Sequence, residues 1–475
     1  MNDSGSEPTT RSIIFYRHCP FDYCKPYEVD IRVNDTWIDE DNQCAFNRTG
    51  ILCGECSSGL SLALGSSECL HCSGHNLLLL LAFAVAGLLL VLFLLICNLT
   101  VSQGTLSGLI FYANIVQVNH AIFFQLAHTK NMWTYILSIF IAWVNLDMGI
   151  HTCFYTGMDA YQKTWLQFVF PIYIWLIAAV IVLLSRNTNV AKVTGRNGVQ
   201  VLATLFLLSF AKLLRAIISA LSVVVLEVHQ RNETITTTDW TTVWLQDGNI
   251  PYLHGKHIPL FMVAVLLSVF LLPYALVLLT IQLLQKMPNT RFLSWVVKLK
   301  PFFDAYTGPY NDRYRFWTGL LLLVRMILFV AFALNAFGDP TLKLMATLLA
   351  CTLVLMCGWI LSGKSNGIYS QWPLNILESS FLLNLGALSA TTACILNHSR
   401  KQEVFVQLSA TIALTTFIGI MLYHAYKQAK CTRAWQYFAA SFQERHYDTQ
   451  GIGFSLTPVM TQTKVDQYRE PLLSN

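Results

Sequence analysis

Ten apolar windows run along most of this chain, and each is long enough to cross a bilayer as a helix. A hydrocarbon core of about 30 Å takes roughly 20 helical residues to cross, and a spanning helix satisfies its own backbone hydrogen bonds. The pattern therefore predicts an all-α polytopic membrane protein. The windows are 77–97, 105–127, 132–150, 165–184, 199–228, 258–284, 316–337, 341–361, 374–396 and 404–423.

Composition agrees with this prediction. Hydrophobic residues make up 54% of the 475 positions and charged residues only 12%, against about 25% charged in ordinary soluble domains. The net charge of +5 is small, and nothing in its distribution favours nucleic-acid binding.

Loop charges predict the orientation. Short cytoplasmic loops collect Lys and Arg, and the basic segments 186–196, 286–315 and 427–433 are therefore expected inside. The segment 229–257 carries more acids than strong bases and a glycosylation sequon at Asn232, so we expect it outside. The tail after Tyr423 then ends in the cytoplasm.

The front half requires that one window does not cross. The cysteine-rich segment before Leu77 is expected outside, which leaves an odd number of spans among the first four windows. We expect 132–150 to lie against the outer face, because it is short, contains Asn145 and Asp147, and runs into a polar stretch. About nine helices then cross. In the competing reading all ten cross and the cysteine-rich segment is cytoplasmic.

Three parts follow from this topology. Residues 1–76 form a small disulfide-rich extracellular segment, 77–425 the transmembrane domain and 426–475 a cytoplasmic tail. The first residues contain no apolar signal sequence. We therefore expect either that the segment is the end of a longer ectodomain, which we favour, or that 77–97 acts as a signal anchor. The expected location is the plasma membrane.

Seven cysteines precede the first window, and the last four follow the spacing C-x2-C-x12-C-x2-C. That spacing fits a structural zinc site in a cytosolic protein. The sequons at Asn34 and Asn47 and the expected exterior location favour disulfides instead. The count is odd, so Cys153 is a candidate for the remaining partner, and the spacing does not give the connectivity. The seven are Cys19, Cys24, Cys44, Cys53, Cys56, Cys69 and Cys72.

The cysteine block QCAFNRTGILCGECSSGLSLALGSSECLHC resembles juxtamembrane modules of the ephrin-receptor and EGF types. The polytopic part resembles the C-terminal domain of transient receptor potential (TRP) channels. Four stretches carry this likeness: WVNLDMGIHTCFYTGMDAYQKTWLQFVFPIYIW, VLATLFLLSFAKLLRAI, PYNDRYRFWTGLLLLVRMIL and NILESSFLLNLG. The resemblance implies a membrane protein of channel or receptor type. It carries over no filter or gate residue.

Polar residues inside the windows mark a candidate pathway. In 199–228, a stripe along one helical face includes the two cations Lys212 and Arg215, with Ser209 on its flank. Such cations must face the interior of the bundle rather than lipid. The other candidates are Arg325, Glu378, Asn384, Asn114, Gln117 and His120.

Two interpretations of these residues stay open. Glu378 is the natural partner for Arg325 or Arg215, in which case the network fixes helix packing. The other interpretation is a permeation or substrate path. An every-third-residue Arg repeat typical of a voltage sensor is missing.

We therefore expect a TRP-like cation channel or channel-like sensor whose outer segment receives mechanical or ligand input. The alternatives are a transporter or lipid carrier for an anionic substrate, and a non-conducting receptor or adhesion protein. No enzyme motif is present, and no cofactor or metal is expected. The expected partners are the lipid bilayer, further copies of the chain and an extracellular ligand.

Overall fold

A computed structural model gives the fold of the chain. It describes residues 11–15, 44–45, 47–64, 68–72, 77–97, 99–119, 123, 141–142, 144–147, 155–187, 198–231, 236–286, 300–333, 340–362, 367–397, 418–419, 422 and 426.

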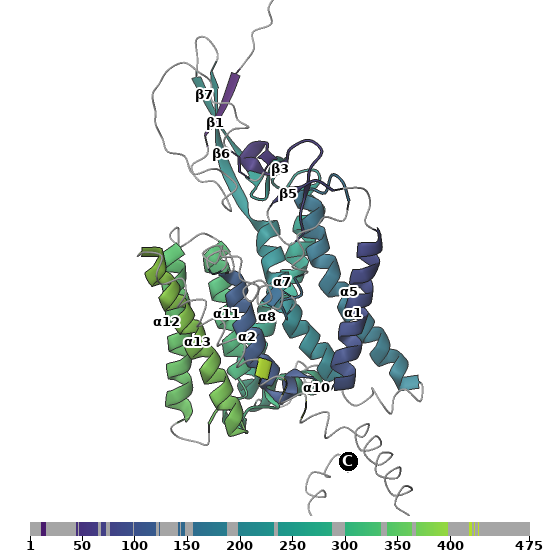
Figure 1. Ribbon diagram of the computed structural model, residues 1–475, viewed down its shortest axis with the longest axis vertical. Coiled ribbons are helices and arrows are strands. Elements are labelled where there is room, and N and C mark those ends of the chain that lie inside the picture. The colour runs from purple at the N-terminus through teal and green to yellow at the C-terminus, as the bar shows by residue number, and fades with distance from the viewer. Residues whose placement is uncertain are drawn as a thin grey trace, which may run out of the picture. The chain divides into compact units, whose positions relative to one another are not determined.

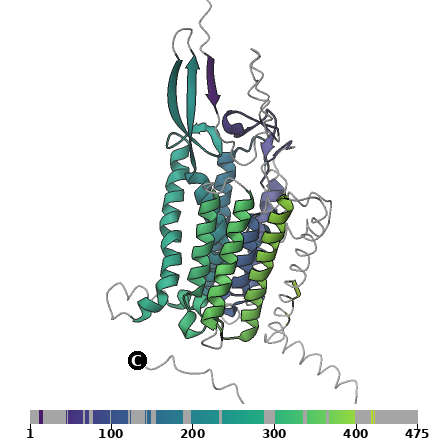
Figure 2. The same cartoon turned by 90° about the vertical axis from the view of Figure 1, so that its left-hand side faces the viewer.

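Most of the described residues belong to a bundle of long helices that lie side by side (Figures 1 and 2). At one end of the bundle stands a β-sheet, and we call this the sheet end. The helices are α1 (Leu77–Cys97), α2 (Thr105–Val118), α5 (Ala160–Asn187), α7 (Gly198–Leu221), α8 (His257–Lys286), α10 (Lys300–Thr307), α11 (Trp317–Ala333), α12 (Pro340–Ser362) and α13 (Trp372–Asn397).

Among these described helices, five are long and apolar enough to cross a membrane. They are Ala160–Leu184, Gly198–Leu221, His257–Thr280, Asp312–Ala333 and Thr341–Leu361. Helix α1 coincides with the predicted window 77–97 and has 21 residues, and α13 has 26. Window 404–423 and most of 132–150 lie outside the described residues. The count of nine spans therefore stays a prediction.

Helix α7 is the central element. In its apolar window 78% of the residues are buried, against 22% in α5, α8 and α12. It packs against α5, α8, α10 and α11. Two of the neighbouring helices, α8 and α11, approach each other closely at Gly319 of α11. A Cβ added to this glycine would lie 2.7 Å from the backbone of Leu278 in α8. A helix surrounded in this way is a suitable carrier for polar side chains, since they face protein rather than lipid.

The structure is mostly helical, as predicted, but a four-stranded sheet departs from the all-α class. The prediction that window 199–228 is one helix was wrong in its last part. Helix α7 ends at Leu221, and after Ser222 the chain continues as β6 (Val223–Arg231). This strand pairs with β1 (Arg11–Phe15) and with β7 (Thr236–Trp244), which pairs in turn with β8 (Asp247–Pro251). All pairs are antiparallel. The β-branched run that opens β6 favours strand over helix once the chain has left the bundle.

The cysteine-rich segment forms two small two-stranded sheets. These pair β2 (Arg48–Thr49) with β3 (Glu55–Cys56) and β4 (Ser61–Leu62) with β5 (Cys69–Leu70). A short 3-10 turn at Ile51–Cys53 places Leu52 against Leu226 and Val243 of the large sheet. Close packing joins the two parts, because a Cβ on Gly54 would lie 2.7 Å from the Cα of Asp247.

Disulfides hold this segment, which decides against the zinc reading for the cysteines concerned. Cys44 bonds to Cys53 and Cys56 bonds to Cys69, and Cys72 is disulfide-bonded as well. A segment with so little apolar surface of its own needs such cross-links to stay ordered. Cys19, Cys24 and Cys153 lie outside the described residues. We call residues 44–72 the disulfide module.

Candidate functional site

Three charged side chains meet inside the bundle. The ammonium of Lys212 donates to Asp147 Oδ1, and Arg215 Nη1 donates to Asp147 Oδ2 at 2.9 Å. The amide of Gln117 in α2 donates to the same Oδ2 at 3.3 Å. The side chain of Lys212 is 9% exposed and that of Asp147 22%. We call Asp147, Lys212 and Arg215 the ion cluster.

The backbone before Asp147 explains how this acid reaches α7. The short helical stretch that includes Ile141 and Val144 ends there, and Leu146 takes a positive φ of 53°. Asn145 fixes the turn, because its side-chain amide donates to Ala113 O of α2 at 3.0 Å and to Ile141 O at 2.7 Å. Window 132–150 therefore does not continue as one helix through its described part. It turns and delivers its acid to the interior.

The charges of the ion cluster do not cancel. Two cations face one carboxylate, so the cluster has a net charge of about +1, and a buried charge is tolerated only when it is paired and hydrogen-bonded. Both carboxylate oxygens of Asp147 are engaged. Lys212 and Arg215 sit at i and i+3 on one face of α7, which lets a single acid hold both.

The end of α7 next to the sheet is fixed by three side chains. Trp244 Nε1 donates to Ser219 O at 2.8 Å, and the Tyr252 hydroxyl donates to Leu221 O at 3.0 Å. His257 Nε2 lies 3.0 Å from Ala220 O. The last carbonyls of a helix have no partner within the helix, and here residues from β7, from the segment after β8 and from the start of α8 supply it. We call Trp244, Tyr252 and His257 the α7 cap.

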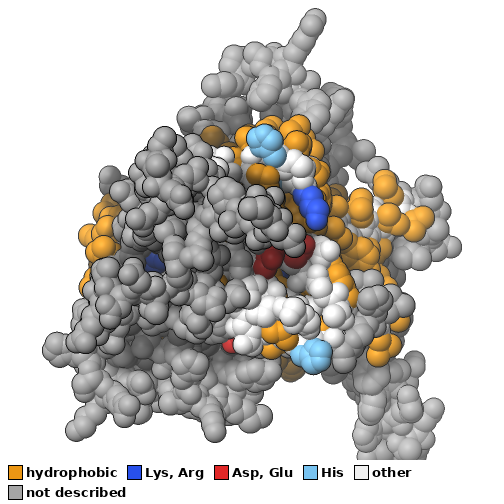
Figure 3. Space-filling view, turned by 90° about the horizontal axis from the view of Figure 1, so that it is seen from above, with side chains coloured by type: hydrophobic (Ala, Val, Ile, Leu, Met, Phe, Trp, Pro, Cys, Tyr) orange, Lys and Arg blue, Asp and Glu red, His pale blue; other side chains and the backbone are white. Residues whose placement is uncertain are grey.

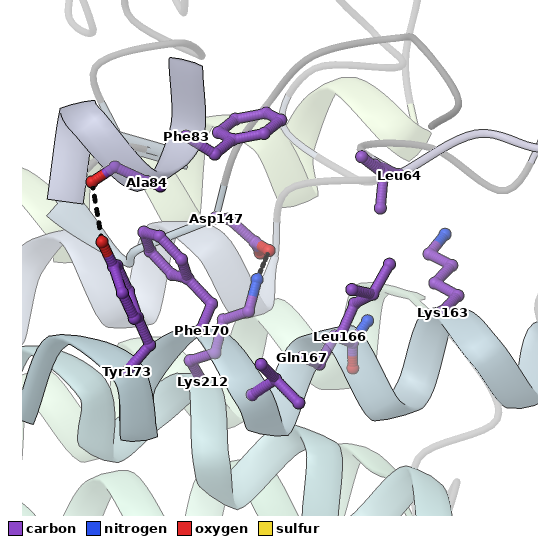
Figure 4. Close-up of a pocket in the computed structure, with 11 residues that line it drawn as sticks. Leu64, Phe83, Ala84, Asp147, Lys163, Leu166, Gln167, Phe170, Tyr173 and Lys212 are labelled. Carbon is purple, nitrogen blue, oxygen red and sulfur yellow. Dashed lines mark hydrogen bonds and ion pairs between the residues drawn. The ribbon is translucent and has the colours of Figure 1, made fainter. Parts of the chain in front are cut away.

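A cavity of about 220 Å³ adjoins the ion cluster. Figure 4 shows Asp147 and Lys212 in its wall, Tyr173 near one end and Lys163 near the other. Apolar side chains from α1 and α5 make up most of the lining, and Leu64 of the disulfide module also contributes to it. The hydroxyl of Tyr173 donates to Ala84 O at 3.0 Å and links the two helices.

A second polar group lies between α2, α11 and α13. Glu378 accepts a hydrogen bond from Trp317 Nε1 at 2.7 Å. Arg325 is 1% exposed, and its guanidinium lies over the ring of Phe111 at 5.1 Å. Its three nitrogens have no hydrogen-bond partner among the described residues. Glu378 and Arg325 interact electrostatically, as expected, but the described residues show no ion pair within 4 Å between Glu378 and either Arg325 or Arg215. Asp147 holds Arg215 instead.

Two of the other candidate residues, Asn384 and Ser209, link neighbouring helices. The Asn384 side chain accepts from the Tyr112 hydroxyl at 3.4 Å, which links α13 to α2. The Ser209 hydroxyl accepts from Trp175 Nε1 at 2.9 Å. The Asn114 amide donates to Ile110 O of its own helix. Gln117 alone of this group touches the ion cluster, and His120 lies outside the described residues.

Carboxylates gather where the disulfide module meets the sheet. Seen from the sheet end, acidic side chains lie close together on this face (Figure 3). Asp247 is 3% exposed, and its side chain accepts from the backbone N–H of Asn249 at 3.0 Å. Burial raises the pKa of Asp247 to about 6, and the carboxylates of Glu55 and Asp159 act in the same direction, while the hydrogen bond from the backbone of Asn249 and the charge of Arg48 oppose the rise.

This raised pKa predicts an acid-stabilised junction. The folded state keeps a proton on Asp247 that the unfolded chain releases near pH 4. The contribution of Asp247 to stability is therefore full below about pH 4 and is lost as the pH rises through about 6, with a size of roughly 1–3 kcal/mol. Thermal unfolding at a series of pH values checks this. Asp247→Asn should flatten the pH profile over this range, and an unchanged profile would contradict the assignment.

Sequence reasoning missed Asp147 as the counter-charge and missed the α7 cap entirely. Asp147 did stand out as an acid in an apolar window, which is the signal that could have identified it.

No family model matches the chain, and no curated protein or solved structure matches it either.

Proposed function

We propose that this multi-pass membrane protein is a channel-like sensor of the cell surface. In this proposal the disulfide module and the sheet lie outside and receive a mechanical or ligand signal, and α7 carries it to the ion cluster. The observation that carries the proposal is the α7 cap, because residues of the sheet region hold the end of the helix that bears Lys212 and Arg215.

The distance along the chain supports direct transmission. Only Ser222 separates α7 from β6. Ser219, which Trp244 holds, is one helical turn from Arg215. A displacement of the sheet must therefore move or bend α7 close to Asp147. In this proposal the Arg215–Asp147 ion pair is the element that opens and closes, and Arg215 is the more accessible of the two cations, with 36% of its side chain exposed.

The outer location of the disulfide module is supported by its chemistry. Disulfides persist in oxidising compartments. Asn47 of the sequon Asn47-Arg48-Thr49 is exposed and lies in a turn with a φ of 58°, which suits a glycan acceptor.

Glycan mapping tests this orientation. We expect one enzyme-removable glycan at Asn47, which Asn47→Gln abolishes. The matched controls are Asn98→Gln and Asn397→Gln, at sequons close to the ends of α1 and α13. Neither control should change the mobility of the protein before or after deglycosylation. The readout is the shift in mobility on deglycosylation, with the sequons at Asn2, Asn34 and Asn232 removed to isolate Asn47. An unmodified Asn47 would contradict the orientation.

We further propose that the protein conducts cations, in line with its resemblance to TRP channels. The test is whole-cell recording, together with an anion-flux assay, on cells in which surface delivery is verified. We expect a cation current that control cells lack and that changes when an impermeant reductant opens the outer disulfides. Anion flux without cation current would replace the channel with a transporter. Neither signal, with normal surface delivery, would leave a non-conducting receptor.

A further inference from the structure

We infer that the cavity beside the ion cluster binds an anionic amphiphile, with its acid group at Lys163 and Lys212 and its chain between α1 and α5. Ligand binding to the purified protein measures this directly, so the inference does not depend on the sensor function. A negative result here would leave that proposal standing.

The positive charge of the cavity lining favours a ligand with an acid group. Asp147, Lys163 and Lys212 all contribute to the wall. The one carboxylate already accepts hydrogen bonds from Lys212, Arg215 and Gln117. The lining therefore has an excess of positive charge. A lysine ammonium has three donors, so Lys212 can hold Asp147 and still donate to a ligand.

The remaining lining selects an apolar chain. Phe83 of α1 and Leu166 and Phe170 of α5 lie along the cavity (Figure 4), and Val169 of α5 also lines it. A small anion alone would leave these side chains facing empty space or water, at a cost proportional to the apolar area. An acyl chain covers them. Cavities of this kind, apolar with a few convergent polar groups, are the usual form of small-molecule sites.

The position of the cavity favours entry from the bilayer. Leu81 and Val85 on α1 are 61% and 46% exposed, and Val169 on α5 is 52% exposed. The cavity thus lies between two helices that present apolar side chains outward. Deeper in the bundle the same helices close together, because a Cβ on Gly87 would lie 3.2 Å from the ring of Tyr173. Leu64 of the disulfide module is part of the lining.

This arrangement gives the ligand a place in the molecule. Its acid group would contact Lys212, and another part of the same ligand would contact Leu64. An occupant would therefore touch both the ion cluster and the disulfide module.

The test measures binding of oleate to the full chain purified in detergent, by native mass spectrometry and by competition. Oleyl alcohol has the same chain without the charge, and we expect it to bind at least about tenfold more weakly, as the loss of a charged hydrogen bond predicts. Dioleoyl phosphatidate and inorganic phosphate complete the set. Competition by phosphatidate identifies a membrane phospholipid as a source of the ligand, and its failure to compete identifies a single-chain acid. Displacement of oleate by inorganic phosphate alone would overturn the inference that the ligand is an amphiphile.

Two variants place the ligand in this cavity. Leu166→Trp should fill it and abolish oleate binding, and the matched control Leu176→Trp, on the outward face of the same helix at 60% exposure, should not. Lys163→Gln should weaken the binding of oleate by about tenfold and leave the binding of oleyl alcohol unchanged. This second variant keeps the test valid if Leu166→Trp does not fold. Equal binding of oleate and oleyl alcohol, or wild-type oleate affinity in Lys163→Gln, would overturn the inference.

Discussion

Asp147→Asn should lower the free energy of unfolding by about 3–5 kcal/mol, because it leaves Lys212 and Arg215 with no counter-charge in a largely buried site. The expected readout is a marked loss of thermal stability of the purified protein and of its monodisperse yield. A conservative change of one oxygen to nitrogen keeps the shape, so the effect isolates the charge. The largest part of the loss should come from Lys212, which is the more deeply buried cation.

The matched control is Asp312→Asn. Asp312 also pairs with an arginine, Arg315, at 2.5 Å, but its side chain is 88% exposed. Such surface pairs contribute about 0–1 kcal/mol. Adding Lys212→Met to Asp147→Asn should restore part of the lost stability, since it removes the buried cation together with its partner. If Asp147→Asn and Asp312→Asn cost the same, the ion cluster is not a stabilising element of the interior.

Gly319→Ala should destabilise the bundle by about 3 kcal/mol or more. In an exposed helix this change adds about 1 kcal/mol of helix propensity. Here the new Cβ would contact the backbone nitrogen of Leu279 and the carbonyl carbon of Leu278, the latter at 2.7 Å. Backbone atoms of a packed helix cannot rotate away, so α8 and α11 must separate. Thermal unfolding of the purified variant measures the loss.

Gly386→Ala is the control for this change. It lies inside α13, and the added Cβ would meet only Leu348 Cδ1, at an ordinary 3.4 Å. We expect it to be neutral or to stabilise the protein by up to about 1 kcal/mol. Equal losses in both variants would mean that α8 and α11 are not in backbone contact at Gly319.

Helix positions were largely predictable from the sequence, because a run of apolar residues long enough to cross a bilayer has few other solutions. Window 77–97 coincides with α1, and windows 341–361 and 374–396 differ from α12 and α13 by only one or two residues at each end. The error in 199–228 has a clear cause. Hydropathy does not separate an apolar strand from an apolar helix, and the valines of β6 extend the window beyond the true end of α7.

The site was predictable only in part. Spacing along one helix shows that Lys212 and Arg215 share a face, because that relation is local. The identity of their partner depends on a turn at Asn145–Leu146 and on how distant segments pack, which no periodicity encodes. Glu378 was the reasonable choice by composition, and it does interact electrostatically with Arg325, but its direct hydrogen bond comes from Trp317 and the acid that holds Arg215 is Asp147. The α7 cap was missed because its members lie in a region expected to be a plain loop.

Hydrogen–deuterium exchange along α7 is the most direct test that the sheet region acts on the ion cluster. The comparison is between wild type, Trp244→Phe, which removes the hydrogen bond to Ser219 O, and Trp240→Phe, an exposed tryptophan on the same strand. We predict that hydrogen exchange in Trp244→Phe accelerates from Ser219 down to Lys212, and that Trp240→Phe leaves exchange in α7 unchanged. Unchanged exchange at Lys212 and Arg215 in Trp244→Phe would contradict it.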